Sequence, residues 1–178
     1  MRGDTDVQRL RDFMKETGRR VREPARIYLT GGSTGLLLGW RETTVDIDVR
    51  FEPDRDELFR LVERLKEELD INVELASPPD FIPQVPGWQE RSLFISREGK
   101  VDFYHFDPYS QALSKIERGH DRDLKDVESL FDSGLIEAGQ LAEFFDEIEP
   151  QLYRYPGIRA GRFRQSVEDV VRKQKRAE

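Results

Sequence analysis

Two aspartates one residue apart are the first pair in the sequence that could do chemistry. Asp46 and Asp48 alternate with apolar residues across positions 45–51, a period of two that predicts a β-strand with its apolar side in a core. Residues i and i+2 of a strand project from one face about 7 Å apart, so both carboxylates can reach one hard cation such as Mg²⁺. The alternative is the solvated side of a half-buried strand.

A small-residue turn precedes this pair. Gly31-Gly32-Ser33 follows the β-prone run 27–30, and residues 33–38 are expected to form a short helix. Glycines after a strand let the backbone approach a ligand closely, and the free N–H groups of such a turn suit phosphate. The alternative is an ordinary strand-to-helix turn, since neither a Walker A sequence nor a Gly-x-Gly-x-x-Gly pattern is present.

Three more residues are candidates on weaker grounds. Asp102 is a lone acid in the β-prone run 101–104, which suggests either a third metal-binding carboxylate or an acid at the wet edge of a hairpin. Asp107, directly before a proline, is typical of a helix N-cap. Lys115, on a predicted helix, is by itself a surface lysine.

The combination of turn and strand resembles the nucleotidyltransferase superfamily that includes DNA polymerase β. The matching residues are Gly31-Gly32-Ser33, Arg41, Thr44 and Asp46-Ile47-Asp48. The 13-position step from Ser33 to Asp46 is similar to that of the abortive-infection group of toxin nucleotidyltransferases and related bacterial proteins.

A further motif of that group has a counterpart later in the chain. Those toxins carry Lys-Leu, nine residues and then Asp, and here Lys115-Ile116 is followed after nine residues by Asp126. The resemblance therefore covers roughly residues 27–130. It implies that Lys115 supplies a cation near the triphosphate, and that Asp126 orients either Lys115 or Arg41.

What the resemblance implies is an enzyme that transfers a nucleoside monophosphate from an NTP, with Mg²⁺ or Mn²⁺ as cofactor. Gly31, Gly32 and Ser33 would bind the triphosphate, and Asp46, Asp48 and Asp102 would bind metal. The expected acceptor is an RNA such as tRNA, a protein or a small molecule, and the chain is a candidate toxin with an antitoxin partner. The alternatives are a non-catalytic nucleotide- or partner-binding module with a degenerate fold, and a metal-dependent phosphodiesterase or nuclease.

Length and composition agree with a single folded unit. The chain has 178 residues, 37% of them hydrophobic and 37% charged, with no cysteine; disulfides, thiol nucleophiles and cysteine zinc sites are excluded. The longest apolar stretch, 35–40, is too short to cross a membrane, and the N-terminus lacks a secretory signal, so we expect a cytoplasmic protein with no membrane partner.

Charge is unevenly distributed. The net charge is −7, but residues 1–26 carry +3, residues 159–178 carry +4, and the middle of the chain carries −14. An acidic centre disfavours nucleic-acid binding by the core unless divalent cations lie there. The basic C-terminal segment is the expected contact if the acceptor is RNA.

The periodicity predicts an α/β (α+β) fold, a mixed β-sheet with flanking helices and a helical C-terminal region. We expect a nucleotidyltransferase-like core over 1–107 and helices packed on it over 108–178. The predicted strands are 27–30, 45–51, 71–75, 91–96 and 101–106. The predicted helices are 5–18, 33–38, 54–69, 109–118, 121–131, 138–149 and 161–175. Residues 77–87, with four prolines, are expected to form a loop.

Overall fold

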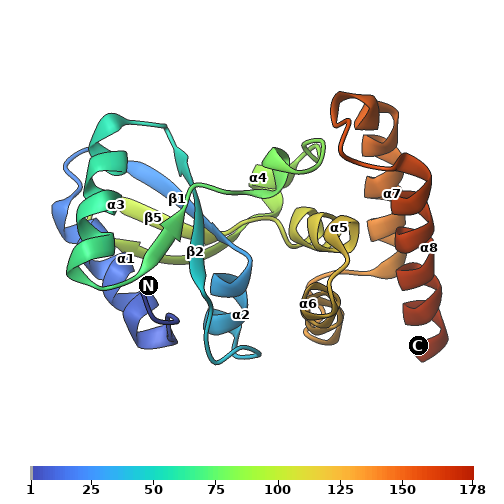
Figure 1. Cartoon of the computed structure of the whole chain (residues 1–178), viewed down its shortest axis with the longest axis horizontal. Helices are drawn as coiled ribbons and strands as arrows, with labels where there is room; N and C mark the ends of the chain where they lie inside the picture. Colours follow the sequence, from blue (N-terminus) through green and yellow to red (C-terminus); the bar gives the residue numbers. More distant parts are fainter. Residues whose placement is uncertain (1) are drawn as a thin grey trace. The chain divides into compact units, whose positions relative to one another are not determined.

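The computed structural model describes residues 2–178 and divides the chain into two compact units. The first extends to Ser77 and includes Ser92–Phe106; the second is formed by Pro78–Arg91 and Asp107–Glu178. Figure 1 labels the elements of both. The segment 78–91, which precedes the predicted division at position 107, thus clusters with the C-terminal helices.

The first unit is built on a five-stranded mixed sheet. Its strands are β1 (Ala25–Thr30), β2 (Asp46–Glu52), β3 (Asn72–Glu74), β4 (Leu93–Glu98) and β5 (Val101–His105). Their order is β3-β2-β1-β5-β4; β1 pairs with β2 antiparallel and with β5 parallel, β2 and β3 are parallel, and β4 and β5 are antiparallel. The predicted mixed sheet with flanking helices is confirmed (Figure 1).

One face of this sheet is covered by helices. Helices α1 (Val7–Arg20) and α3 (Asp56–Glu68) pack their apolar stripes on the inward residues of the strands, among them Ile27, Leu29 and Val49, which are fully or almost fully buried. Burial of this apolar surface is the main stabilising contribution to the unit. Along β2 buried and half-buried positions alternate strictly, so the predicted period of two is confirmed.

The predicted start of this strand is corrected by one residue. Val45 lies before the first residue of β2 and is 48% exposed, although the alternation pattern placed it in the core. The reason is local: the preceding residue, Thr44, forms an isolated bridge with Thr5, and regular pairing with β1 involves only Asp48 and later residues of β2.

The second unit is helical. Its elements are η1 (Pro78–Asp80), α4 (Trp88–Arg91), α5 (Pro108–Arg118), α6 (Asp121–Asp132), α7 (Ala138–Ile148), η2 (Glu149–Arg154) and α8 (Ala160–Ala177). The sequence missed α4 and η2, because four and six residues are too few to display a helical period. The predicted helix cap is confirmed: the Asp107 carboxylate accepts hydrogen bonds from the N–H groups of Tyr109 and Ser110.

The long loop is held to this unit by one buried ion pair. Arg91 donates two hydrogen bonds to the fully buried Asp107 carboxylate, at 3.1 and 2.8 Å, and its guanidinium lies 4.0 Å from the ring centroid of Phe144. Trp88, the first residue of α4, is buried, with 1% of its surface exposed. Across residues 2–178, every helix is too short or too polar to pass through a bilayer.

Candidate functional site

The glycine turn and the paired aspartates lie together at one end of the sheet. Gly31 follows β1 with φ +65° and ψ −133°, a combination that residues with a side chain rarely adopt, and serves as N-cap of α2 (Gly32–Leu38). In the antiparallel register of β1 and β2, Thr30 lies opposite Asp48. A β-carbon at position 31 would be 2.7 Å from Asp48 Oδ2. Only glycine therefore suits this position, both for its backbone angle and for the carboxylate beside it.

Asp46 and Asp48 share the face of β2 that the core does not bury. Both are half-buried, while Ile47 between them is fully buried. This follows from the pleat of the strand, which directs alternate side chains to opposite faces. The predicted placement of both carboxylates on one face is confirmed.

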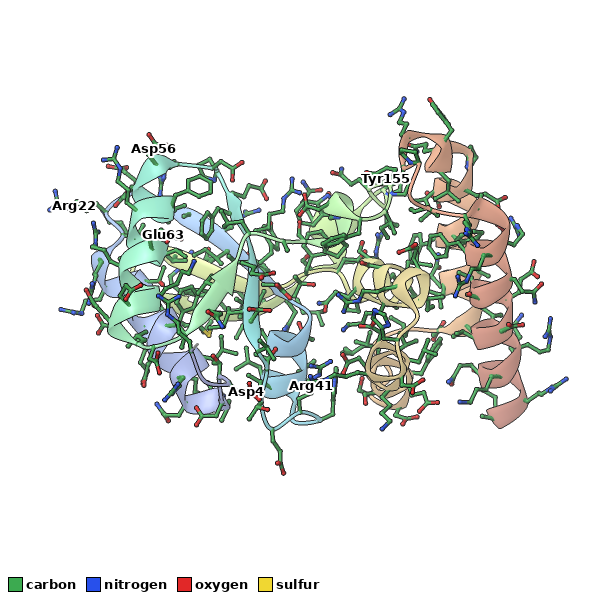
Figure 2. All side chains as sticks on the ribbon, viewed as in Figure 1. Asp4, Arg22, Arg41, Asp56, Glu63 and Tyr155 are labelled. Carbon is green, nitrogen blue, oxygen red and sulfur yellow. The ribbon has the colours of Figure 1, made fainter. Side chains whose placement is uncertain are left out.

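Two residues of the predicted motif close around the second glycine. A β-carbon on Gly32 would collide with the hydroxyl of Thr44 and lie 3.2 Å from Arg41 Nη1. The Thr44 hydroxyl donates a 3.0 Å hydrogen bond to the carbonyl oxygen of Asp46. Arg41 follows the end of α2, where Figure 2 labels it. Three residues that are separated in the sequence motif, Gly32, Arg41 and Thr44, are thus close together in the folded chain.

Ser33 carries a polar atom that the protein itself does not satisfy. The residue is fully buried, and its hydroxyl oxygen has no hydrogen-bond partner among residues 2–178. Leaving a buried hydroxyl unpaired costs about 1–3 kcal/mol, so an unpaired hydroxyl at this position suggests a hydrogen-bond partner from outside the chain. A ligand oxygen at the turn would supply the missing partner.

His105, for which the sequence shows no ligand or catalytic spacing, supports the same turn from the opposite face of the sheet. Its Nδ1 is 3.1 Å from the hydroxyl of Thr34, the residue after Ser33, and both side chains are buried. Burial lowers the pKa of His105 to about 4, so the imidazole is neutral at pH 7. Its inward parity on the strand 101–105, next to the buried Phe103, is the sequence signal that could have placed it.

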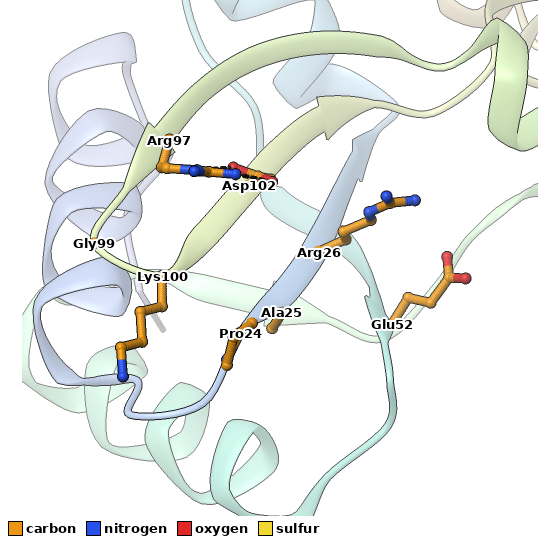
Figure 3. A pocket seen from close by; sticks show the side chains of 8 residues that line it. All are labelled: Pro24, Ala25, Arg26, Glu52, Arg97, Gly99, Lys100 and Asp102. Carbon is orange, nitrogen blue, oxygen red and sulfur yellow. Dashed lines mark hydrogen bonds and ion pairs between the residues drawn. The ribbon is translucent and has the colours of Figure 1, made fainter.

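The structure does not bring Asp102 to this end of the sheet. Asp102 pairs in register with Arg26 on β1, four residues before Thr30, a separation of about 13 Å along the strand. Its carboxylate accepts two hydrogen bonds from Arg97, at 2.6 and 2.9 Å (Figure 3), and these hold the pKa of Asp102 below its usual value. Within residues 2–178 no three candidate metal ligands gather in one place.

Lys115 and Asp126 belong to the second unit, where they form a buried pair. Lys115 is 7% exposed, and its Nζ donates a 2.7 Å hydrogen bond to Asp126 Oδ2. Asp123, 3.8 Å from the same Nζ, is also held by two hydrogen bonds from Arg118. Of the two partners that the motif left open for Asp126, Lys115 is therefore in direct contact with it. The catalytic role of the pair stays a prediction.

The geometry in the first unit fits a cation-bound phosphate. Mg²⁺ in proteins is commonly held by one or two carboxylates together with waters and substrate phosphates, and Asp46 and Asp48 provide two on one face. At Gly31 the Asp48 Oδ2 atom takes up the space that a β-carbon would need, so this carboxylate lies directly beside the turn. Two residues later, the buried Ser33 hydroxyl has no hydrogen-bond partner within residues 2–178. Two carboxylates, a glycine turn and a buried hydroxyl without a partner in the described part of the chain are thus combined at one end of one sheet.

Comparison with known families identifies a nucleotidyltransferase family. A family model described as "Nucleotidyltransferase of unknown function (DUF6036)" matches residues 7–175. Neither a curated protein nor a solved structure matches the chain. The match supports the wider superfamily, whereas the closer relation to the toxin-type group stays a prediction.

Proposed function

The chain belongs to this family of nucleotidyltransferases of unknown function, and on that premise we propose that it transfers a nucleoside monophosphate from an NTP to a hydroxyl acceptor with the help of Mg²⁺ or Mn²⁺. The binding site consists of the turn Gly31–Ser33 with Asp46 and Asp48. Asp102 has no part in it, because Arg97 engages its carboxylate near the other end of β1.

One observation carries this proposal: the Asp48 carboxylate lies directly against the glycine turn at Gly31. A phosphate bound to this turn without a metal ion would lie next to the Asp48 carboxylate, and the two negative charges would repel each other. Two unit charges of the same sign 4 Å apart repel by about 4 kcal/mol near a protein surface. A divalent cation between carboxylate and phosphate removes this repulsion, so the geometry suits a metal-bound nucleotide better than a free anion.

In this proposal the residues of the site bind phosphate, bind the metal ion or position those that do. The Ser33 hydroxyl and the turn's backbone amides hold phosphate oxygens, and Asp46 and Asp48 would hold the metal ion. When bound, the metal ion neutralises charge on the phosphates and favours departure of the leaving group. Thr44 fixes the backbone of Asp46 through its hydrogen bond, and His105 fixes α2 through Thr34. Phosphoryl-type transfer relies mainly on such positioning and charge stabilisation.

The reaction balances without any further reagent. The acceptor hydroxyl oxygen forms a bond to the α-phosphorus, the bond from that phosphorus to the bridging oxygen breaks, and pyrophosphate leaves with the electron pair. The hydroxyl proton is released to solvent. RNA, protein and small-molecule hydroxyls are all chemically competent acceptors.

The decisive experiment incubates the purified protein with Mg²⁺, α-labelled NTPs and each class of acceptor. We expect label transfer by the wild type and a loss of at least about a hundredfold in Asp46→Asn and Asp48→Asn, since metal-mediated charge stabilisation is removed. Asp54→Asn, at an exposed position after β2, is the matched control and should retain full activity. Transfer at the wild-type rate by both site variants would refute the proposal. A wild type that is stabilised by NTP without turnover would instead indicate the non-catalytic module.

A further inference from the structure

The face of the sheet that carries Asp46 and Asp48 also carries a row of aromatic rings. Phe94 on β4 packs edge-on against Tyr104 on β5, with centroids 5.6 Å apart, and Tyr104 stacks on Tyr28 of β1 at 5.4 Å with 27° between the ring planes. Tyr28 is buried, Tyr104 is half-buried, and Phe94 is 59% exposed on the edge strand. The row thus opens toward solvent at its β4 end.

This row of rings begins two residues along β1 from the proposed site. Tyr28 and Tyr104 face each other in the register of β1 and β5, two residues before Thr30, which lies opposite Asp48. Two residues correspond to about 7 Å along a strand, on the same face. A ligand that extends from the carboxylates along this face therefore reaches the accessible rings, Tyr104 and Phe94, before it reaches Arg26.

Beyond the rings lies a charged cavity of 480 Å³. Figure 3 shows Arg26 and Glu52 extending in one direction from neighbouring strands, and the Arg97 guanidinium joined to Asp102. The Arg26 guanidinium is 5.8 Å from the centroid of Tyr104, and the Arg97 side chain is 70% exposed despite its ion pair. The Oε2 atom of Glu52 is buried and lacks a hydrogen-bond partner among residues 2–178.

We propose that this face of the sheet binds single-stranded nucleic acid, the acceptor of the transfer. Its terminal hydroxyl would lie at Asp46 and Asp48, its next bases would stack on Tyr104 and Phe94, and its backbone phosphates would bind Arg26 and Arg97. This inference rests on the proposed function, since it identifies the acceptor used at that site.

Three physical features favour a nucleic-acid strand over a protein or a small molecule. Aromatic rings that reach solvent on a sheet, here Phe94 and the half-buried Tyr104, can stack nucleobases of any sequence. The two ends of the face differ in charge as such a strand requires, with carboxylates for a metal-bound triphosphate at one end and guanidinium groups for phosphates about 13 Å away. The unpaired Glu52 oxygen suits an amino group on a base edge.

The acidic middle of the chain does not contradict this inference. Net charge over residues 27–158 is −14, but at the cavity the Asp102 carboxylate is already paired with Arg97. Arg26, Arg97 and Lys100 outnumber Glu52 and Asp102 among the residues that line it. The basic C-terminal segment stays a predicted additional contact; within it, Arg164 is bound to Glu149, Asp146 and Glu168.

The test measures binding of fluorescein-labelled eight-nucleotide RNA and DNA strands to the full chain by anisotropy, without NTP. We expect both strands to bind the wild type and Phe94→Leu to weaken binding roughly tenfold, because a leucine keeps apolar contact but cannot stack. Phe94→Tyr should restore binding. Phe81→Leu, at an equally bulky residue that is 51% exposed in the second unit, is the matched control and should bind as the wild type does.

Salt dependence gives an independent measurement. Loss of one phosphate contact in Arg26→Gln should reduce the slope of log K against log salt by about 0.7. Absence of binding, or wild-type affinity and slope in both Phe94→Leu and Arg26→Gln, would overturn the inference. Melting temperatures identify any variant that has lost its fold. If Phe94→Leu is such a variant, binding by Phe94→Tyr decides whether an aromatic ring at this position is required.

The two proposals fail in distinguishable ways. If the proposed function holds and this inference does not, the wild type labels a protein or small molecule while the strands stay unbound. If the reverse is true, Asp46→Asn and wild type bind strands equally and in a Phe94-dependent manner, yet neither transfers label. Phe94-dependent binding together with Asp46-dependent label on the strand supports both.

Discussion

The carboxylate of Asp48 lies where the first side-chain atom of residue 31 would be: a β-carbon on Gly31 would come within 2.7 Å of Asp48 Oδ2. These two residues are 17 positions apart in the chain, and the antiparallel pairing of β1 with β2 joins them. The contact converts two ordinary sequence features, a glycine turn and an Asp-x-Asp strand, into one site.

Gly31→Ala tests this contact. We expect NTP-dependent stabilisation and transfer to be lost, because the methyl group displaces the Asp48 carboxylate, and stability to fall by about 1–2 kcal/mol from left-handed backbone strain. Gly134→Ala is the matched control, since Gly134 has φ +74° and open space around it. It should also lose stability from its positive φ but retain full activity, as measured by chemical denaturation and label transfer. Equal activity in the two variants would contradict the assignment.

Ser33→Ala should change stability and function in opposite directions. Removing a buried hydroxyl without a partner leaves the free energy of unfolding unchanged or slightly increased, whereas NTP binding should weaken roughly tenfold or more, as for a hydrogen bond to a charged group. Ser110→Ala is the comparison, because its buried hydroxyl donates a 2.7 Å hydrogen bond to Asp107 and its loss should destabilise the protein by about 1 kcal/mol. Thermal melts with and without Mg²⁺-NTP measure both effects, and unchanged NTP affinity in Ser33→Ala would count against the turn as a phosphate site.

Asp126→Ala should destabilise the protein by about 3 kcal/mol, because it leaves the buried Lys115 ammonium without its nearest carboxylate. On the same helix, Glu128 pairs with Lys173 at the surface, and Glu128→Ala should change stability by less than about 1 kcal/mol. Urea denaturation measures both. The double variant Lys115→Met with Asp126→Leu should recover most of the stability. If it also transfers label normally, the catalytic role predicted for Lys115 is wrong.

The free energy of unfolding should decrease as the pH is lowered from 7.5 to 5, because His105 takes up a proton more readily in the unfolded state than in the folded state. The folded-state pKa of about 4 lies below the value of about 6.5 in an unfolded chain, so the unfolded state takes up protons first and the folded state loses stability as pH drops below 6.5. At pH 5 this one group accounts for about 2 kcal/mol. Denaturation at the two pH values should show that difference in the wild type and a smaller one in His105→Gln. An identical pH dependence in both would contradict a neutral, buried imidazole.

Local patterns in the sequence determined the elements and the chemical character of the site. The alternation over 45–51 was sufficient to place Asp46 and Asp48 on one face, because a strand directs successive side chains to opposite sides regardless of its neighbours. The spacing of Gly31-Gly32-Ser33, Arg41, Thr44 and the aspartates identified the superfamily. The helix cap at Asp107 needed only the adjacent proline and helix start.

The tertiary structure alone decided which of these residues meet. Strand order and register are set by pairing between distant segments, which a period of two does not encode. That register keeps Asp102 level with Arg26, four residues before Thr30, although it lies on the correct face. It also aligns Tyr28, Tyr104 and Phe94, which come from three strands, into one row. Likewise, the orphaned hydroxyl of Ser33 and the neutral state of His105 depend on burial, which exists only once the chain is packed.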